Sequence, residues 1–362
     1  MGGRLGDRTA GALVAVESNP ATMAIVHHWQ PQRTHVFAVG VLQYADKVHW
    51  PLEGRRDAVL IETLEQRGVP PENITFLKDA EATTAAFEAA FVAHLQRTAP
   101  GDQLFVYYAG HGARDEKHGR GSFKLRDARL PVSAIFAWIE RHFRGEMAIL
   151  TADCCYSGSL ALEAPMRAGR VAYAALGSSL STETSTGAWT FTNCWIDALL
   201  GRVFVDLDAD GVLRLDELAR YAERRLSVID GQVCSFAVAN GFPSTFALAK
   251  ATPRVHPRQG QFIEARQDSK WCRAEILDAR DQTLELRWVD DDTCSSVDEQ
   301  DVRTWCPPEL TPGEPVSVKH AGQCYPAVVL AARHGMHLVR FDAWDESWDE
   351  WISPDRIEGL VT

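Results

Sequence analysis

Apolar runs of strand length alternate with segments of helical periodicity over residues 34–250. The segments with strand composition are residues 34–42, 73–77, 103–111, 147–153 and 170–176. The segments with apolar residues at helical spacing are 55–67, 83–97, 133–143, 191–200 and 215–226, and Thr83 or Thr84 is a suitable N-cap for the second of them. Strands that alternate with helices predict an α/β domain, with a mostly parallel sheet that helices cover on both faces.

The pattern changes after residues 251–253, where helical periodicity ends and short alternating segments begin. These segments are residues 260–266, 271–277 and 284–289 and, after the break at Pro307 and Pro308, residues 315–319, 325–331 and 337–341. The two sets have similar patterns, which predicts two small SH3-like or Tudor-like β-barrels at residues 257–307 and 311–362. Each has about fifty residues, which is near the lower limit for independent folding.

Composition is typical of a soluble, cytoplasmic protein. Hydrophobic residues make up 46% of the 362 residues, and the net charge of −12 argues against bulk binding of nucleic acid. The eight cysteines form no CxxC pair, which fits a reducing compartment better than a disulfide framework. Residues 1–32 contain no segment that is apolar enough for a signal-peptide core or a membrane span. We interpret them as a weakly structured leader.

Two motifs carry candidate chemistry, and each closes an apolar strand-like run. Residues 107–112 read Tyr-Tyr-Ala-Gly-His-Gly and end the first run, and residues 153–158 read Asp-Cys-Cys-Tyr-Ser-Gly and end the second. Open α/β sheets place their chemistry at the carboxyl ends of strands, and imidazole is the usual base for a thiol. We therefore predict a catalytic dyad of His111 and Cys155, and interpret Cys154 as a small buried hydrophobic residue.

The two motifs, which lie 44 residues apart from His111 to Cys155, resemble those of caspase-like cysteine peptidases. Within that group the resemblance is to the metacaspase and bacterial caspase-homologue branch, and it covers residues 33–250. It implies a mostly parallel six-stranded sheet, an endopeptidase activity that requires no cofactor for its chemistry, and a role in bacterial stress or antiviral defence. By position in the motif, Cys155 is the nucleophile. The backbone amides of Gly112 and Cys155 are the expected oxyanion donors.

The resemblance also implies a specificity for basic residues. Asp153 matches the acidic pocket residue of metacaspase-like enzymes, and Asp57 matches their second carboxylate, although the stretch after Gly54 is one residue shorter than usual. Two carboxylates around one guanidinium form a geometry-selective site, so we expect cleavage of proteins after exposed Arg, or Lys. Asp57 is equally suited to capping its helix.

The sequence leaves two mechanisms of activation open, self-cleavage and the binding of an activator. Residues 159–169 are too short for a long removable linker, although Arg167, Arg170 or the exposed loop at 114–126 offer sites for self-cleavage. Activation by a protein partner, a ligand or calcium is the other alternative.

A twelve-residue segment follows the EF-hand calcium-loop template, with a glycine at its sixth position. The expected ligands are Asp206, Asp208, Asp210, the Val212 carbonyl and Glu217. The alternative is a solvated acidic turn that caps the helix from Leu215.

The second barrel ends in a stretch rich in aromatic and acidic residues. Tyr325, Trp344, Trp348 and Trp351 are expected to bind a basic or methylated peptide, because clustered aromatic faces attract cations. The alternative is that they form the core of a small barrel.

Two further functions stay open: a non-catalytic scaffold that acts through these barrels, and a cysteine hydrolase of a non-peptide amide.

Overall fold

The computed structural model describes residues 13–15, 28–44, 52, 54–115, 119–186, 188–291, 293–306, 310–320, 322–333 and 335–360. They divide into two compact units. The first consists of residues 1–200, 213–222 and 233–249, and the second of residues 201–212, 223–232 and 250–362.

A seven-stranded sheet forms the centre of the first unit, in the order β1-β11-β9-β8-β4-β2-β3. Its strands are β1 (Leu13–Ala15), β2 (Thr34–Gly40), β3 (Ile74–Lys78), β4 (Gln103–Ala109), β8 (Met147–Asp153), β9 (Ala172–Gly177) and β11 (Ser235–Ala239). The pairs from β3 to β9 are parallel, whereas β11 runs antiparallel to β9. The sheet is mostly parallel, as predicted. The expected six strands gain a seventh, because β1 from the expected leader pairs with β11.

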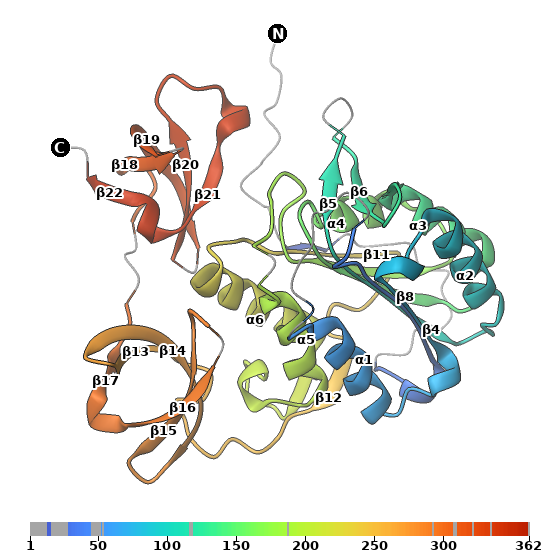
Figure 1. The fold of residues 1–362 in the computed structure, drawn as a ribbon, viewed down its shortest axis with the longest axis horizontal. Coiled ribbons are helices and arrows are strands. Elements are labelled where there is room, and N and C mark those ends of the chain that lie inside the picture. Colours follow the sequence, from blue (N-terminus) through green and yellow to red (C-terminus); the bar gives the residue numbers. More distant parts are fainter. Residues whose placement is uncertain are drawn as a thin grey trace. The chain divides into compact units, whose positions relative to one another are not determined.

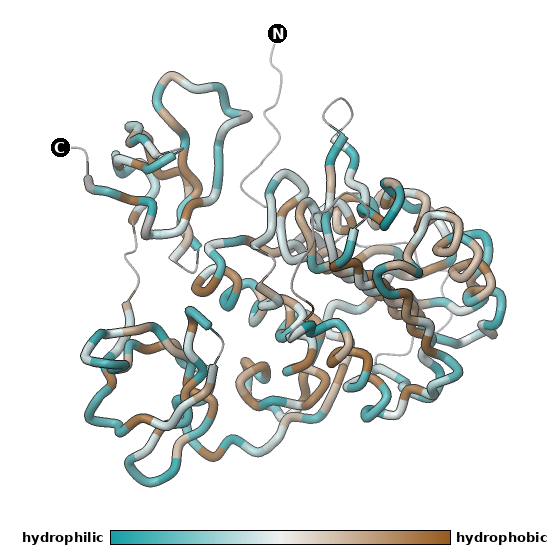
Figure 2. The backbone as a smooth tube through the Cα atoms, viewed as in Figure 1, coloured by the Kyte–Doolittle hydropathy of each residue, from teal (hydrophilic) through white to brown (hydrophobic). Residues whose placement is uncertain are grey.

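Helices cover both faces of this sheet (Figure 1). They are α1 (Arg56–Gln66), α2 (Thr84–Gln96), α3 (Val132–His142), α4 (Ser159–Glu163), α5 (Thr190–Leu199) and α6 (Leu215–Ile229). On one face Phe37 of β2 contacts Phe87 and Phe91 of α2, and on the other Phe105 of β4 contacts Trp195 of α5. Hydrophobic segments are concentrated along the central strands (Figure 2), where both faces are buried.

The chain after His111 forms a small antiparallel sheet instead of the predicted loop at 114–126. Its strands are β5 (Gly112–Arg114), β6 (Gly121–Lys124) and β7 (Arg129–Pro131). The sheet is anchored by Phe123, whose ring stacks on Tyr108 at 4.1 Å between centroids. Residues 159–166 are likewise helical, because α4 continues into the 3-10 helix Ala164–Met166.

The second unit contains two five-stranded antiparallel sheets, each with its own apolar core. The first has the order β16-β15-β14-β13-β17, with β13 (Phe262–Gln267), β14 (Lys270–Arg280), β15 (Thr283–Trp288), β16 (Cys294–Asp298) and β17 (Val302–Thr304). The second has the order β21-β20-β19-β18-β22, with β18 (Pro315–His320), β19 (Gln323–Arg333), β20 (Met336–Phe341), β21 (Glu350–Ile352) and β22 (Ile357–Leu360). The closure of each sheet into a barrel stays a prediction.

The remaining elements are short. β10 (Val212–Arg214) and β12 (Ala247–Lys250) form a two-stranded sheet. Short 3-10 helices also occur at Pro31–Arg33, Pro71–Asn73, Asp79–Glu81, Val203–Val205, Glu299–Asp301, Glu346–Trp348 and Pro354–Arg356.

Candidate active site

The His and Cys motifs follow two neighbouring strands of the sheet. β4 and β8 are parallel, and their last residues, Ala109 and Asp153, are paired. His111 and Cys155 each lie two residues beyond these ends. The two turns therefore leave the sheet at the same edge, side by side.

The backbone of His111 is fixed on both sides. Its N–H donates to the Tyr44 hydroxyl at 2.6 Å, and its carbonyl accepts from the Tyr108 hydroxyl at 2.8 Å and from the Lys124 N–H at 2.8 Å. The Tyr44 ring lies 4.8 Å from the imidazole, between centroids. Because the hairpin β5–β6 supplies Lys124, the small antiparallel sheet holds the histidine turn in place.

Gly112 brings the two turns into direct contact. A Cβ atom at this position would lie 1.7 Å from the carbonyl oxygen of Cys155 and 3.2 Å from the Cys154 sulfur. Real Cβ atoms do not approach a backbone atom so closely, so only glycine allows this packing. The requirement for glycine thus comes from the approach of the two motifs to each other.

The neighbouring cysteines lie in different environments. Cys154 is 2% exposed, and burial raises the pKa of its thiol well above the usual value. Cys155 is half-buried, and its Sγ accepts a hydrogen bond from the Ser185 N–H at 3.2 Å. Tyr156, directly after it, has a φ of 58°, so the turn that presents Cys155 is strained.

Asp153 points towards the first turn of α5. Its Oδ2 accepts from the Thr192 hydroxyl at 2.7 Å and from the Thr192 N–H at 3.2 Å. Burial raises the pKa of Asp153, although the bonds from Thr192 oppose this shift. Its carboxylate therefore interacts with a helix N-terminus, where negative charge is stabilised.

Asp57 is fully buried and pairs with an arginine two residues away. The Arg55 guanidinium donates to both oxygens of Asp57, from Nε at 2.8 Å and from Nη2 at 2.6 Å. A third bond, from Nη1, reaches Asp79 at 2.8 Å. Asp57 also accepts the Ala58 N–H at 2.8 Å, but it is the second residue of α1 and Arg55 takes the N-cap position without a side-chain cap bond, so the alternative role of Asp57 as the cap was wrong. The site expected to hold a substrate guanidinium thus already holds one from the chain itself.

The two predicted pocket carboxylates lie on one face of the sheet. Gly40, Ala109 and Asp153 are aligned across three adjacent strands, and a Cβ at Gly40 would meet Asp57 Oδ2 at 1.8 Å. Burial raises the pKa of Tyr107 well above its usual range, and the charges of Asp153 and Asp57 add to the shift. The Thr192 hydroxyl lies 2.7 Å from both Asp153 Oδ2 and the Tyr107 hydroxyl, which places Asp153 beside Tyr107, near the edge from which the two motifs emerge.

The predicted calcium loop gathers three of its expected ligands. One carboxylate oxygen from each of Asp206, Asp208 and Asp210 lies within 4.8 Å of the others. Glu217 Oε2 instead accepts the Arg214 N–H at 2.9 Å, which is the bond of a capping residue at the start of α6.

The aromatic residues of the second C-terminal sheet divide into two groups. The Trp344 ring lies 5.1 Å from Tyr325, 5.3 Å from Trp348 and 4.8 Å from Phe341, between centroids. Trp351 makes no such ring contact within the described part of the chain, and its neighbour across the strands is Leu338. Three of the four predicted peptide-binding residues, Tyr325, Trp344 and Trp348, are thus brought together. Together with Phe341, they form what we call the aromatic cluster.

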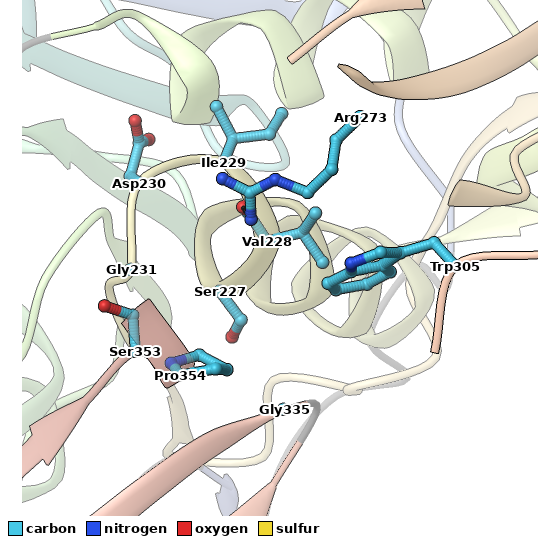
Figure 3. A pocket seen from close by; sticks show the side chains of 10 residues that line it. All are labelled: Ser227, Val228, Ile229, Asp230, Gly231, Arg273, Trp305, Gly335, Ser353 and Pro354. Carbon is cyan, nitrogen blue, oxygen red and sulfur yellow. Dashed lines mark hydrogen bonds between the residues drawn. The ribbon is translucent and has the colours of Figure 1, made fainter. Parts of the chain in front are cut away.

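A polar cavity of about 160 Å³ lies elsewhere in the second unit. Its lining residues are Ser227, Val228, Ile229, Asp230, Gly231, Arg273, Trp305, Gly335, Ser353 and Pro354. Figure 3 shows the Arg273 guanidinium beside Val228, whose carbonyl accepts its Nη1–H at 2.9 Å. No lining residue belongs to the His111 or Cys155 motif, so this cavity is separate from the candidate active site.

Three residues of the site were not predicted from the sequence. Tyr44 positions His111, Ser185 contacts the Cys155 sulfur, and Arg55 neutralises Asp57. Only Arg55 carried a signal, because it is a cation two residues before the predicted pocket carboxylate. Tyr44 and Ser185 lie far from the motifs in the sequence, and tertiary folding alone brings them there.

Comparisons with known proteins found distant structural matches. No protein-family model and none of the curated proteins matches the chain. Among solved structures, protein GSU0716 from Geobacter sulfurreducens matches with 13% identity and a TM-score of 0.46, over 61% of this chain and 100% of its own. The Drosophila initiator caspase Dronc matches with 12% identity and a TM-score of 0.38, over 68% of this chain and 98% of its own. At these scores the matches carry no argument about function.

Within the described ranges, none of the helices has both the length and the apolar character that a bilayer crossing requires.

Proposed function

We propose that this protein is a caspase-like cysteine endopeptidase, with Cys155 as nucleophile and His111 as general base and acid. The observation that carries the proposal is the contact of Gly112 with the Cys155 carbonyl, at the carboxyl ends of two adjacent parallel strands. Proteins with open α/β sheets place their ligands and chemistry at this edge of the sheet. The partial exposure of Cys155, against the burial of Cys154, supports the choice of nucleophile.

The proposed reaction follows the usual course of thiol acylation. Cys155 Sγ attacks the scissile carbonyl carbon as His111 accepts the thiol proton, and the amides of Gly112 and Cys155 stabilise the oxyanion. His111 then gives the proton to the leaving amine, and the carbon–nitrogen bond breaks to leave a thioester. Water, deprotonated by His111, hydrolyses the thioester and restores the thiol.

The proposed specificity is for Arg, or Lys, before the cleaved bond. Asp57 and Asp153 supply the negative charge on one face of the sheet, next to the edge that carries the dyad. Since Arg55 already pairs with Asp57, the substrate cation has to displace this guanidinium or share the carboxylate with it. An activating protein partner is part of the proposal, because such a partner supplies the free energy for this exchange.

The test is turnover of fluorogenic peptides that end in Arg, Lys or Asp. We expect wild type to cleave the Arg peptide fastest, and Cys155→Ala to lower the rate by at least about 10³-fold, as loss of a nucleophile does. Cys154→Ala is the matched control, because it removes a buried thiol from the adjacent position and keeps the nucleophile. Equal losses in both variants, or no turnover of any of the three peptides under any activation condition, would contradict the proposal.

The scaffold alternative gains support from one observation, the aromatic cluster of the second C-terminal sheet. Trp348 is 56% exposed, an unusual state for a large aromatic residue. Asp345 and Glu346 flank the cluster, whereas Asp349 pairs with Arg340. Negative charge beside aromatic faces favours a cation. We therefore propose that this sheet binds a basic or methylated peptide, as a targeting module beside the peptidase or as the sole activity of the chain.

A further inference from the structure

The loop between the 3-10 helix Val203–Val205 and β10 concentrates negative charge. Asp206, Asp208 and Asp210 alternate along it, and one oxygen of each carboxylate lies within 4.8 Å of the others. Three formal negative charges at this separation repel one another, and a bound cation removes that repulsion.

Backbone hydrogen bonds orient each of the three carboxylates. The Gly211 N–H donates to Asp206 Oδ2 at 3.0 Å, the Asp210 N–H to Asp208 Oδ1 at 3.2 Å, and the Val212 N–H to Asp210 Oδ1 at 2.9 Å. Gly211 has a φ of 86°, a conformation that favours glycine. The loop thus holds the carboxylates in a fixed arrangement.

Asp206 provides an independent sign of a missing ligand. It is 3% exposed, and its Oδ1 is buried without a hydrogen-bond partner in the described part of the chain. Buried carboxylate oxygens almost always have a partner, and each exception calls for an explanation. A cation among the three carboxylates would satisfy this oxygen.

We propose that residues 206–212 bind one calcium ion. The ligands are the carboxylates of Asp206, Asp208 and Asp210 and the carbonyl of Val212, with water in the remaining positions. Oxygen donors of mixed carboxylate and carbonyl type suit calcium, whereas magnesium demands a stricter octahedral arrangement. Glu217 is left out because its carboxylate caps α6. The proposal does not depend on the peptidase activity.

The test is calorimetric titration of the chelator-treated full chain with calcium and, separately, with magnesium. We expect one calcium per chain, an increase in the melting temperature, and weaker binding of magnesium. Asp206→Asn retains an acceptor for the Gly211 N–H but removes the charge, and should weaken calcium binding by at least about tenfold, since charge count sets affinity in such loops. Asp208→Asn, at an exposed position, should do the same and covers the case in which Asp206→Asn does not fold.

Asp291→Asn is the matched control. Asp291 lies in another exposed acidic turn and likewise accepts backbone and hydroxyl hydrogen bonds, both from Thr293. This variant should bind calcium like wild type. The proposal is overturned if millimolar calcium gives neither heat nor a melting shift, if both folded loop variants bind like wild type, or if magnesium binds more tightly.

Discussion

At the scale of single residues, charge pairing decides whether the proposed acidic pocket can accept a substrate cation. Asp57 is completely buried and both of its oxygens are bonded to Arg55, whose side chain is 16% exposed. A substrate guanidinium would form the same bidentate pair, so exchange replaces one ion pair by another. Arg55 is therefore an internal competitor for the proposed substrate.

Arg55→Gln tests this competition. We expect the KM for the Arg peptide to fall about tenfold with kcat unchanged, because about 1.4 kcal/mol of pairing with Asp57 becomes available to the substrate. Steady-state kinetics with the Arg and Asp peptides measure the effects of the substitution on KM and on kcat separately. Unfolding experiments should show a loss of stability, since Asp57 loses its buried partner.

The neighbouring Arg56→Gln is the control for this substitution. Arg56 is the first residue of α1, directly after Arg55, but it donates to Asn193 at 2.6 Å. The KM for the Arg peptide should therefore stay at the wild-type value. A higher KM in Arg55→Gln would show that Arg55 helps to form the pocket. Loss of Asp-peptide cleavage would show that Arg55 itself recognises an acidic substrate.

The sequence predicted the carboxylates but not their partners. Asp57 and Asp153 were selected through the resemblance, and nothing local indicated that Thr192 would bond to Asp153. Such pairs depend on which helices pack against the sheet. Periodicity predicts that a helix exists and does not predict which side chain of its first turn meets a strand end.

At the scale of elements, two turns after adjacent strands have to fit against each other. Gly112→Ala tests this fit, because the new Cβ would lie 1.7 Å from the Cys155 carbonyl oxygen and would force the two turns apart. Since misplacement of reacting groups by about 1 Å costs around 10²-fold in rate, we expect at least that loss of peptide turnover. Circular dichroism and the same peptide assay measure the fold and the rate.

Gly169→Ala is the matched control for this substitution. A Cβ at Gly169 would meet only Glu140, at 3.8 Å, which is an ordinary contact. Full activity of Gly112→Ala, or an equal loss in Gly169→Ala, would contradict the proposed role of the contact between the two turns.

The elements that the sequence predicted are those with long apolar runs. Residues 104–109 and 147–150 are continuously hydrophobic, and they lie in β4 and β8, which are buried along their whole length. β5 and β7 have three residues each, too few to show a period. They form because Phe123 packs on Tyr108 and because the Lys124 N–H donates to the His111 carbonyl. Both contacts are tertiary.

At the scale of the whole molecule, the two proposed activities belong to different compact units. His111 and Cys155 lie in the first unit and the aromatic cluster in the second, where Tyr325 and Trp344 also pack against the sheet's apolar core. The alternative interpretation of the aromatic residues as core therefore holds in part for these two. Trp348 is mostly exposed, so its ring contributes less to the core than to the surface.

Trp348→Ala in the full chain separates the two activities. We expect binding of a trimethyllysine peptide, measured by titration calorimetry, to weaken by about tenfold, since cation–π attraction at a partly exposed site is worth about 1 kcal/mol and the lost apolar contact adds to it. Turnover of a short Arg peptide should stay unchanged, because Trp348 lies outside the unit that contains the dyad. Trp351→Ala, which removes a ring outside the cluster, should retain the peptide. Equal weakening in both variants would assign these residues to the fold of the sheet, and a parallel loss of turnover would mean that the peptide site regulates catalysis.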